Sequence, residues 1–243
     1  MKNKLQLFLG RVIAIWALIW FVSTMFFFIW FYLLCFFLQE PYKTRWHRTI
    51  SKIWMGLFLT LVGCRFTIKG KHHFKNLGPA IVICNHNSLI DVPLSTPFLP
   101  RANKTIAKKS SIYVPLFGWI YQFGSVIVDR KNDQSRRASF EKMKHTLDKG
   151  LDMLIYPEGT RNKTSEPLKS FYDGAFKLAI ETQKPIIPVV LLNTKKVLPA
   201  YPIMCFKPGK IQMDILTPIP SEGHTVQSLK QTAFDIMSAH YKM

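Results

Sequence analysis

A histidine and an aspartate at short spacing are the residues of this sequence best suited to acid–base chemistry. His86 and Asp91 belong to the segment N-H-N-S-L-I-D at 85–91, which follows a short β-branched, apolar run. If the turn brings Asp91 back onto the imidazole, the carboxylate fixes the ring tautomer and the other ring nitrogen can take a proton from a hydroxyl. A structural alternative is that Ser88 and Asp91 form a capping box and that His86 is a polar loop residue.

The block Y-P-E-G-T-R at 156–161 is a second candidate and also follows a predicted strand. Glu158 is a carboxylate, Gly159 lets the backbone approach a ligand, and Thr160 offers a hydroxyl. Arg161 offers a planar guanidinium that suits a phosphate or a carboxylate. A third block, G-S-V-I-V-D-R at 124–130, ends a predicted strand at Arg130. Each block also has an ordinary interpretation, as a polar turn or as a surface Asp-Arg pair.

Several other kinds of catalytic centre have no counterpart in the sequence. No G-x-S-x-G motif offers a nucleophilic serine, and no H-E-x-x-H motif offers a zinc site. The four cysteines include no C-x-x-C pair, so we expect reduced structural thiols. They are Cys35, Cys64, Cys84 and Cys205. We therefore expect no metal and no covalent enzyme intermediate.

The elements that must position these residues alternate between strand and helix. Short β-branched runs predict strands at 66–68, 80–84, 125–128, 153–156, 186–192 and 211–216. Helical periodicity predicts helices at 136–149, 174–182 and 226–241. This alternation predicts an α/β fold with a mixed, largely parallel sheet covered by helices. Open α/β sheets carry their sites beyond the carboxyl ends of the strands, where the three blocks fall.

The N-terminal part of the chain has a different composition. Residues 12–39 contain no Asp, Glu, Lys, Arg or His. As a helix this run would reach about 42 Å, compared with about 30 Å for the hydrocarbon core of a bilayer. A shorter apolar stretch follows at 53–64. These segments predict an apolar two-helix membrane anchor in residues 1–64, followed by an α/β domain in residues 65–243.

Charge leaves the membrane topology open. Basic residues flank the long apolar run on both sides, so the positive-inside rule gives no orientation. One arrangement is a helical hairpin that enters a single leaflet, and the other is a spanning helix followed by an interfacial one. The formal net charge of +19 predicts an anionic partner, either nucleic acid, acidic lipid headgroups or a phosphorylated substrate.

The order of these blocks along the chain is stronger evidence for a particular protein family than any single block is. The order N-H-x4-D, G-x-x-x-x-D-R, P-E-G-T-R and then I-P-V-V at 187–190 resembles the glycerolipid acyltransferase family typified by the lysophosphatidic acid acyltransferases. By this resemblance His86 is the general base and Asp91 orients it, while the 187–188 pair lines the acyl or acceptor side. The residues implied for binding the acceptor and its phosphate are Lys108, Arg130, Glu158, Gly159, Thr160 and Arg161.

The resemblance implies direct acyl transfer from an acyl-CoA or acyl carrier protein thioester to the free hydroxyl of lysophosphatidic acid. The product would be phosphatidic acid for phospholipid synthesis, with the thioester as co-substrate and no other cofactor. It also implies membrane phospholipids as partners and a bacterial inner-membrane location, with the active domain facing the cytoplasm. The family often reads F-K-x-G-A-F where this chain has Tyr172 in place of lysine, and Lys169 or Lys177 is the candidate substitute.

Two other functions stay open. A few pocket residues decide the acceptor, so a lyso-aminolipid, another lysophospholipid or glycerol-3-phosphate is an alternative substrate. A non-catalytic, membrane-tethered module that binds anionic lipid or nucleic acid would also account for the positive charge. The sequence has no RNP-like aromatic strand and no recognised DNA-binding motif, so we expect no nucleic-acid partner.

Overall fold

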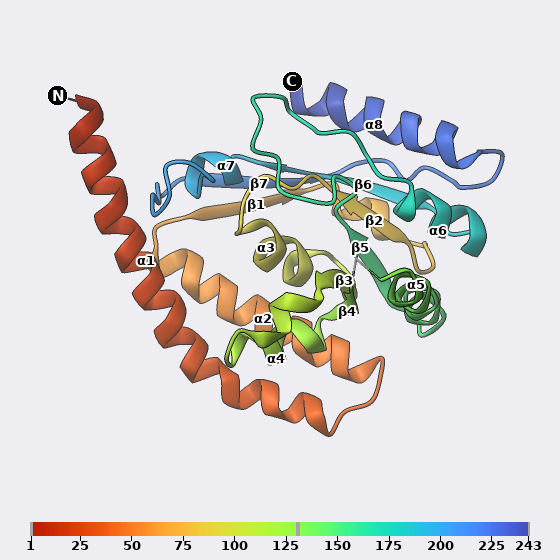
Figure 1. Cartoon of the computed structure of the whole chain (residues 1–243), viewed down its shortest axis with the longest axis horizontal. Coiled ribbons are helices and arrows are strands. Elements are labelled where there is room, and N and C mark those ends of the chain that lie inside the picture. Colours follow the sequence, from red (N-terminus) through yellow and green to blue (C-terminus); the bar gives the residue numbers. More distant parts are fainter. Residues whose placement is uncertain (1, 130–131, 243) are drawn as a thin grey trace.

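A seven-stranded sheet organises the computed structural model, which describes residues 2–129 and 132–242 (Figure 1). The strand order is β1-β7-β6-β2-β5-β3-β4, and every neighbouring pair is parallel except β6 with β7. The strands are β1 (Arg65–Lys69), β2 (Ile81–Cys84), β3 (Asn103–Lys108), β4 (Ser125–Val128), β5 (Asp152–Ile155), β6 (Ile186–Leu192) and β7 (Lys210–Ile215). The predicted class, a mixed and largely parallel sheet covered by helices, is confirmed.

Six of these strands coincide with the predicted ranges to within one residue at either end. The exception is β3, which was not predicted and which lies between β5 and β4. Its sequence N-K-T-I-A-K has lysine at the second and last positions and buries only alternate residues. It therefore lacks the continuous apolar run that identifies the central strands.

Helices cover both faces of the sheet (Figure 1). Side chains alternate along a strand, so Ile81 and Ile83 face a core built with α5, α6 and α8, while Val82 faces the opposite core. On that opposite face lie α2, α3 and α4. The helices of the α/β part are α3 (Asp91–Phe98), α4 (Phe117–Phe123), α5 (Asp133–Asp148), α6 (Gly174–Thr182), α7 (Thr194–Val197) and α8 (Val226–Lys242). Short 3-10 helices are η2 (Lys71–Phe74) and η3 (Lys109–Tyr113).

The N-terminal region corrects the prediction of an apolar two-helix anchor. It contains α1 (Lys2–Tyr32), the 3-10 helix η1 (Leu33–Phe36) and α2 (Tyr42–Leu61). Among the described residues, only the segment Lys4–Phe36 is long and apolar enough to cross a membrane. The apolar stretch at 53–64 is instead the second half of an amphipathic helix, which buries Trp54 and Phe58 and exposes Lys52. Its apolar face packs on protein, so one apolar helix takes the place of the predicted two.

The long helix α1 contacts the rest of the chain near both of its ends. Near its start, the Gly10 carbonyl accepts a 3.0 Å hydrogen bond from the Phe206 backbone N–H. Just beyond its end, the Phe36 ring packs on Phe123 with 4.9 Å between centroids. The outer face is apolar and exposed along its whole length, and it includes Phe8, Trp16, Ile19, Phe27 and Trp30. The division of the chain into 1–64 and 65–243 stays a prediction, because Met55 and Phe58 of α2 share a hydrophobic cluster with Leu94 of α3.

Candidate active site

The predicted histidine and aspartate meet at the carboxyl end of β2. The Nδ1 atom of His86 lies 2.9 Å from Oδ2 of Asp91, and the His86 side chain is 18% exposed while that of Asp91 is fully buried. A carboxylate at this position favours the tautomer in which Nδ1 carries the proton. The second ring nitrogen, Nε2, is then left as an unprotonated acceptor.

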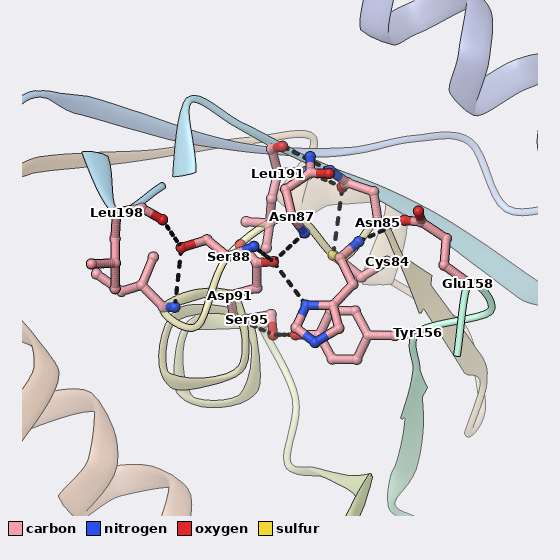
Figure 2. Close-up of polar contacts among 12 residues, drawn as sticks. Cys84, Asn85, Asn87, Ser88, Asp91, Ser95, Tyr156, Glu158, Leu191 and Leu198 are labelled. Carbon is pink, nitrogen blue, oxygen red and sulfur yellow. Dashed lines mark hydrogen bonds and ion pairs between the residues drawn. The ribbon is translucent and has the colours of Figure 1, made fainter. Parts of the chain in front are cut away.

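The Asp91 carboxylate also organises the turn that carries the histidine. Its Oδ2 accepts hydrogen bonds from the backbone N–H groups of Asn87 at 2.6 Å and Ser88 at 2.7 Å (Figure 2). The structural and the catalytic interpretation of the N-H-x4-D block are therefore compatible. One buried oxygen closes the turn before α3 and also fixes the imidazole.

The block at 156–161 holds the backbone of the histidine. Oε1 of Glu158 accepts the His86 N–H at 2.7 Å, and the His86 carbonyl accepts the Asn162 N–H at 2.6 Å. The other Glu158 oxygen accepts the Lys169 N–H at 3.0 Å. Burial raises the pKa of the Glu158 carboxyl, and these backbone bonds partly offset that effect. Glu158 is fully buried, so its contacts are those of a positioning residue and differ from those expected of an acceptor ligand.

Asn85 is a site residue to which sequence reasoning assigned no role. Its side-chain amide donates to the Leu191 carbonyl at 3.0 Å, and its Oδ1 accepts the Leu191 N–H at 2.7 Å (Figure 2). This two-point contact ties the end of β2 to β6, its neighbour in the sheet. The contact joins residues far apart in the chain, so only the strand order reveals it.

Tyr156 was also missed as an individual residue. Its ring lies 4.5 Å from the His86 ring, with 36° between the planes. Its hydroxyl is 2.6 Å from the Ser95 hydroxyl, which donates to the Asp91 carbonyl at 2.9 Å (Figure 2). Burial raises the pKa of Tyr156 well above its ordinary value, so the residue packs the histidine as a neutral phenol.

The remaining residues of the 156–161 block are Gly159, Thr160 and Arg161. Gly159 has a φ of +70°, a conformation that favours glycine and lets the loop turn back. Lys169 Nζ donates to the Thr160 hydroxyl at 2.8 Å. The Arg161 side chain makes no ion pair with any described residue and is partly exposed. A cationic pair, Arg161 and Lys169, thus lies in the loops that hold His86.

The other predicted ligands have different surroundings. Lys108 is exposed and ends β3, at the same edge of the sheet as His86. Arg130 lies outside the described residues. Lys177 lies on α6 and approaches Glu181 at 3.8 Å, so of the two proposed substitutes for the missing family lysine only Lys169 reaches the 156–161 block. Ile187 is fully buried inside β6, so it packs the sheet and does not line an open site.

An apolar pocket lies between α2, α3 and α4. Val92 and Pro93, which directly follow Asp91, line it together with side chains of α2 and α4. Those side chains include Trp54, Met55, Phe117 and Ile120. Within the described residues, no group of three His, Cys, Asp or Glu side chains is arranged to hold a metal ion. The site therefore combines an oriented imidazole with two cations in the neighbouring loops, and the apolar pocket includes the two residues that follow Asp91.

Comparisons with known proteins identify the family of this chain. A family model described as Acyltransferase matches residues 65–192. The 1-acyl-sn-glycerol-3-phosphate acyltransferase of Cocos nucifera is 34% identical over 169 residues, covering 68% of this chain and 54% of that protein. An uncharacterized acyltransferase of Schizosaccharomyces pombe is 31% identical over 193 residues, covering 78% of this chain and 68% of that protein. The matched segment spans little more than half the length of the coconut relative.

A solved structure has the same fold. The crystal structure of the 1-acyl-sn-glycerophosphate (LPA) acyltransferase PlsC from Thermotoga maritima superposes with a TM-score of 0.81. The match covers 96% of this chain and 95% of that chain at 21% sequence identity. It therefore extends over the N-terminal helices as well as the α/β part.

Proposed function

Since this chain belongs to the acyltransferase family, we propose that it transfers a fatty acyl group from an acyl thioester to the free hydroxyl of lysophosphatidic acid. The donor is an acyl-CoA or an acyl-acyl carrier protein, and the product is phosphatidic acid. One observation carries the proposal: within the family-matched segment, His86 Nδ1 lies 2.9 Å from the buried Asp91 carboxylate. That contact leaves Nε2 available to a substrate hydroxyl.

In this mechanism His86 acts as the general base. Nε2 takes the hydroxyl proton while the hydroxyl oxygen bonds to the thioester carbonyl carbon, and Asp91 stabilises the resulting imidazolium. Collapse of the tetrahedral intermediate breaks the C–S bond, and the imidazolium returns the proton to the departing thiolate. Backbone N–H groups at the start of α3 are the candidates to bind the intermediate's oxyanion. Both substrates are bound together, so the enzyme gains rate from orientation without forming an acyl-enzyme.

Cations near the histidine would bind the phosphate of the acceptor. Arg161 offers a planar fork without a protein ion-pair partner among the described residues, and Lys169 lies in the adjoining loop. Lys108 and Arg130 follow strands that end at the same edge of the sheet. The apolar pocket that begins at Val92 and Pro93 would accept the start of the acyl chain.

Membrane location follows from the same substrates. The acceptor and the product are lipids, and the exposed apolar face of α1 is suited to hold the enzyme in a bilayer. We expect membrane phospholipids as partners and a bacterial inner-membrane location, with the active site facing the cytoplasm.

An assay of the full chain in detergent micelles with one acyl-CoA tests the proposal. Lysophosphatidic acid should be acylated faster than lysophosphatidylethanolamine, a lyso-aminolipid or glycerol-3-phosphate. His86→Ala should abolish transfer while the protein remains folded. Asp91→Asn keeps an oxygen acceptor but loses the charge, so kcat should fall by about a hundredfold or more. Retained turnover in His86→Ala would contradict the mechanism.

The acceptor is tested separately through Arg161. Arg161→Ala should raise KM or lower kcat for lysophosphatidic acid by about tenfold or more, because a charge-assisted phosphate contact is lost. Any zwitterionic acceptor should be affected much less. Equal losses on both acceptors would contradict a phosphate role for Arg161. If no acceptor is acylated and the protein still binds anionic vesicles, the non-catalytic binding module is supported instead.

A further inference from the structure

A polar hollow lies at the amino ends of the parallel strands, whereas the active site lies at their carboxyl ends. It measures about 330 Å³ and lies near the amino ends of β3 and β4, where Lys104 and Ser125 line it. His86 and the 156–161 block instead follow the carboxyl ends of β2 and β5, which run parallel to β3. A strand of four to six residues separates the two edges by roughly 13–20 Å. The hollow is therefore a place distinct from the acceptor site.

Four of the eleven residues that line the hollow have basic side chains: Lys104, Lys142, His145 and Lys149. Lys142 and His145 of α5 and Lys149 just beyond it lie at i, i+3 and i+7 and share one face of the helix. Neither Lys142 nor Lys149 forms an ion pair with any described residue. The single carboxylate of the lining, Glu40, lies 2.6 Å from Lys104 and is already neutralised by it. Positive charge without a protein counterion is thus concentrated around an open space.

This hollow adjoins the apolar N-terminal region. Glu40 closely follows Phe36, the last residue of η1, and Phe37; these two side chains are 55% and 83% exposed. Phe36 packs on Phe123, two residues before Ser125 of the lining. Cations beside exposed aromatic side chains suit a phosphate held at the surface of a bilayer.

We propose that the hollow formed by Lys104, Lys142, His145 and Lys149 binds a phosphate-bearing anion, separately from the catalytic site. A phosphodiester lipid headgroup and a free phosphate ion share the chemistry that these side chains recognise. This site does not depend on acyl transfer, so its test uses ligands that are not acceptors in that reaction.

Binding can be measured on the full chain in neutral detergent with an environment-sensitive fluorophore attached at Gln122→Cys, which lines the hollow. The four native cysteines are buried, so labelling is selective. The probes are dihexanoyl phosphatidylglycerol, dihexanoyl phosphatidylcholine and inorganic phosphate. We expect a saturable response to phosphatidylglycerol or to inorganic phosphate and none to phosphatidylcholine. Tighter binding of phosphatidylglycerol would identify a lipid site, and equal binding of inorganic phosphate would identify a site for the ion itself.

Charge variants decide whether the hollow is responsible. Lys142→Glu with Lys149→Glu should weaken binding by about tenfold or more, since each lysine near an anionic lipid adds severalfold affinity. The matched control, Lys71→Glu with Lys75→Glu, removes two exposed lysines beside β1 at the other edge of the sheet and should leave affinity unchanged. If charge reversal at the end of α5 unfolds the protein, Lys142→Gln with Lys149→Gln replaces it. No saturable response to either anion, or an equal loss in the control pair, would overturn the proposal.

Discussion

At the scale of single residues, two buried carboxylates hold His86 from different parts of the chain. Asp91 fixes the ring through Nδ1, and Glu158 fixes the backbone through the His86 N–H. Asn162 binds the carbonyl of the same residue. Ring and backbone are therefore restrained before any substrate arrives, which lowers the cost of orienting the base.

Glu158→Gln is predicted to lower kcat and leave KM for the acceptor nearly unchanged. The glutamine NH₂ group must face one of the two backbone N–H groups that the carboxylate now accepts, so one of these contacts is lost. We expect kcat to fall by at least about tenfold and unfolding free energy to fall by about 1–3 kcal/mol. Steady-state kinetics with thermal denaturation of the same preparation measures both. A raised KM at constant kcat would instead indicate an acceptor ligand.

His47 makes the stability of the protein depend on pH. Its ring is buried, with Nε2 at 3.0 Å from the Ile120 carbonyl and Nδ1 without a hydrogen-bond partner among the described residues. Burial lowers the pKa of His47 to about 4, although the bond to Ile120 opposes the shift. Between about pH 6.5 and 4 only the unfolded chain binds this proton, so stability falls as pH falls in that window. Above it the imidazole is neutral in both states and contributes no pH dependence.

The expected size of this effect is about 2 kcal/mol between about pH 7 and pH 5. Thermal denaturation of wild type and His47→Gln at both pH values should show a smaller pH shift in the variant, because its side chain does not titrate. The matched control is His72→Gln, which replaces an exposed histidine and should retain the wild-type dependence. An unchanged pH shift in His47→Gln would contradict the buried neutral imidazole.

At the scale of elements, the local sequence pattern was enough to predict the residue ranges of most strands, but it did not predict which strands lie next to one another in the sheet. The apolar runs of β2 and β6 are readable directly, and Gly150, with φ of +76°, ends α5 as predicted. Strand order is not a local property of the sequence. The hydrogen bonds between Asn85 and Leu191 and between Glu158 and His86 join residues in or after different strands, so they could not be predicted from the sequence. For the same reason the sequence indicated the residue types of the site but not the backbone contacts that Glu158 makes with His86 and Lys169.

The contact between α2 and the start of β4 requires a glycine. A Cβ atom at Gly124 would lie 2.5 Å from Cε1 of the buried His47 ring. Gly124→Ala should therefore lower unfolding free energy by about 1–3 kcal/mol through overpacking. Gly56→Ala on α2 is the matched control, because nothing lies within 4 Å of its added Cβ, and it should stabilise the helix by roughly 0.5–1 kcal/mol. Chemical denaturation of both variants measures the expected loss of unfolding free energy in Gly124→Ala and the expected gain in Gly56→Ala.

At the scale of the whole molecule, the position of α1 favours one of the two topologies. Gly10 and Phe36 both contact the α/β part, although they lie near opposite ends of the apolar segment. A helix held along a polar domain at both ends keeps those ends in the same aqueous compartment. The chain is therefore expected to enter one leaflet without crossing the bilayer.

This topology is tested with cysteine labelling in sealed vesicles. Lys4→Cys and Arg45→Cys flank the apolar segment and replace exposed residues, while the native cysteines are buried. A membrane-impermeant maleimide should label both positions from the same side. Labelling of the two positions from opposite sides would show that α1 spans the membrane.

The pairing of β1 with β7 has a consequence for how the protein is made. Arg65 pairs with Lys210, so the first strand gains its neighbour only after most of the chain has left the ribosome. By then α1 has long been synthesised, while the 205–206 segment that contacts Gly10 has only just appeared. The exposed outer face of α1 can therefore meet lipid before the sheet is complete. We therefore expect the sheet to close at the bilayer, with membrane targeting preceding folding.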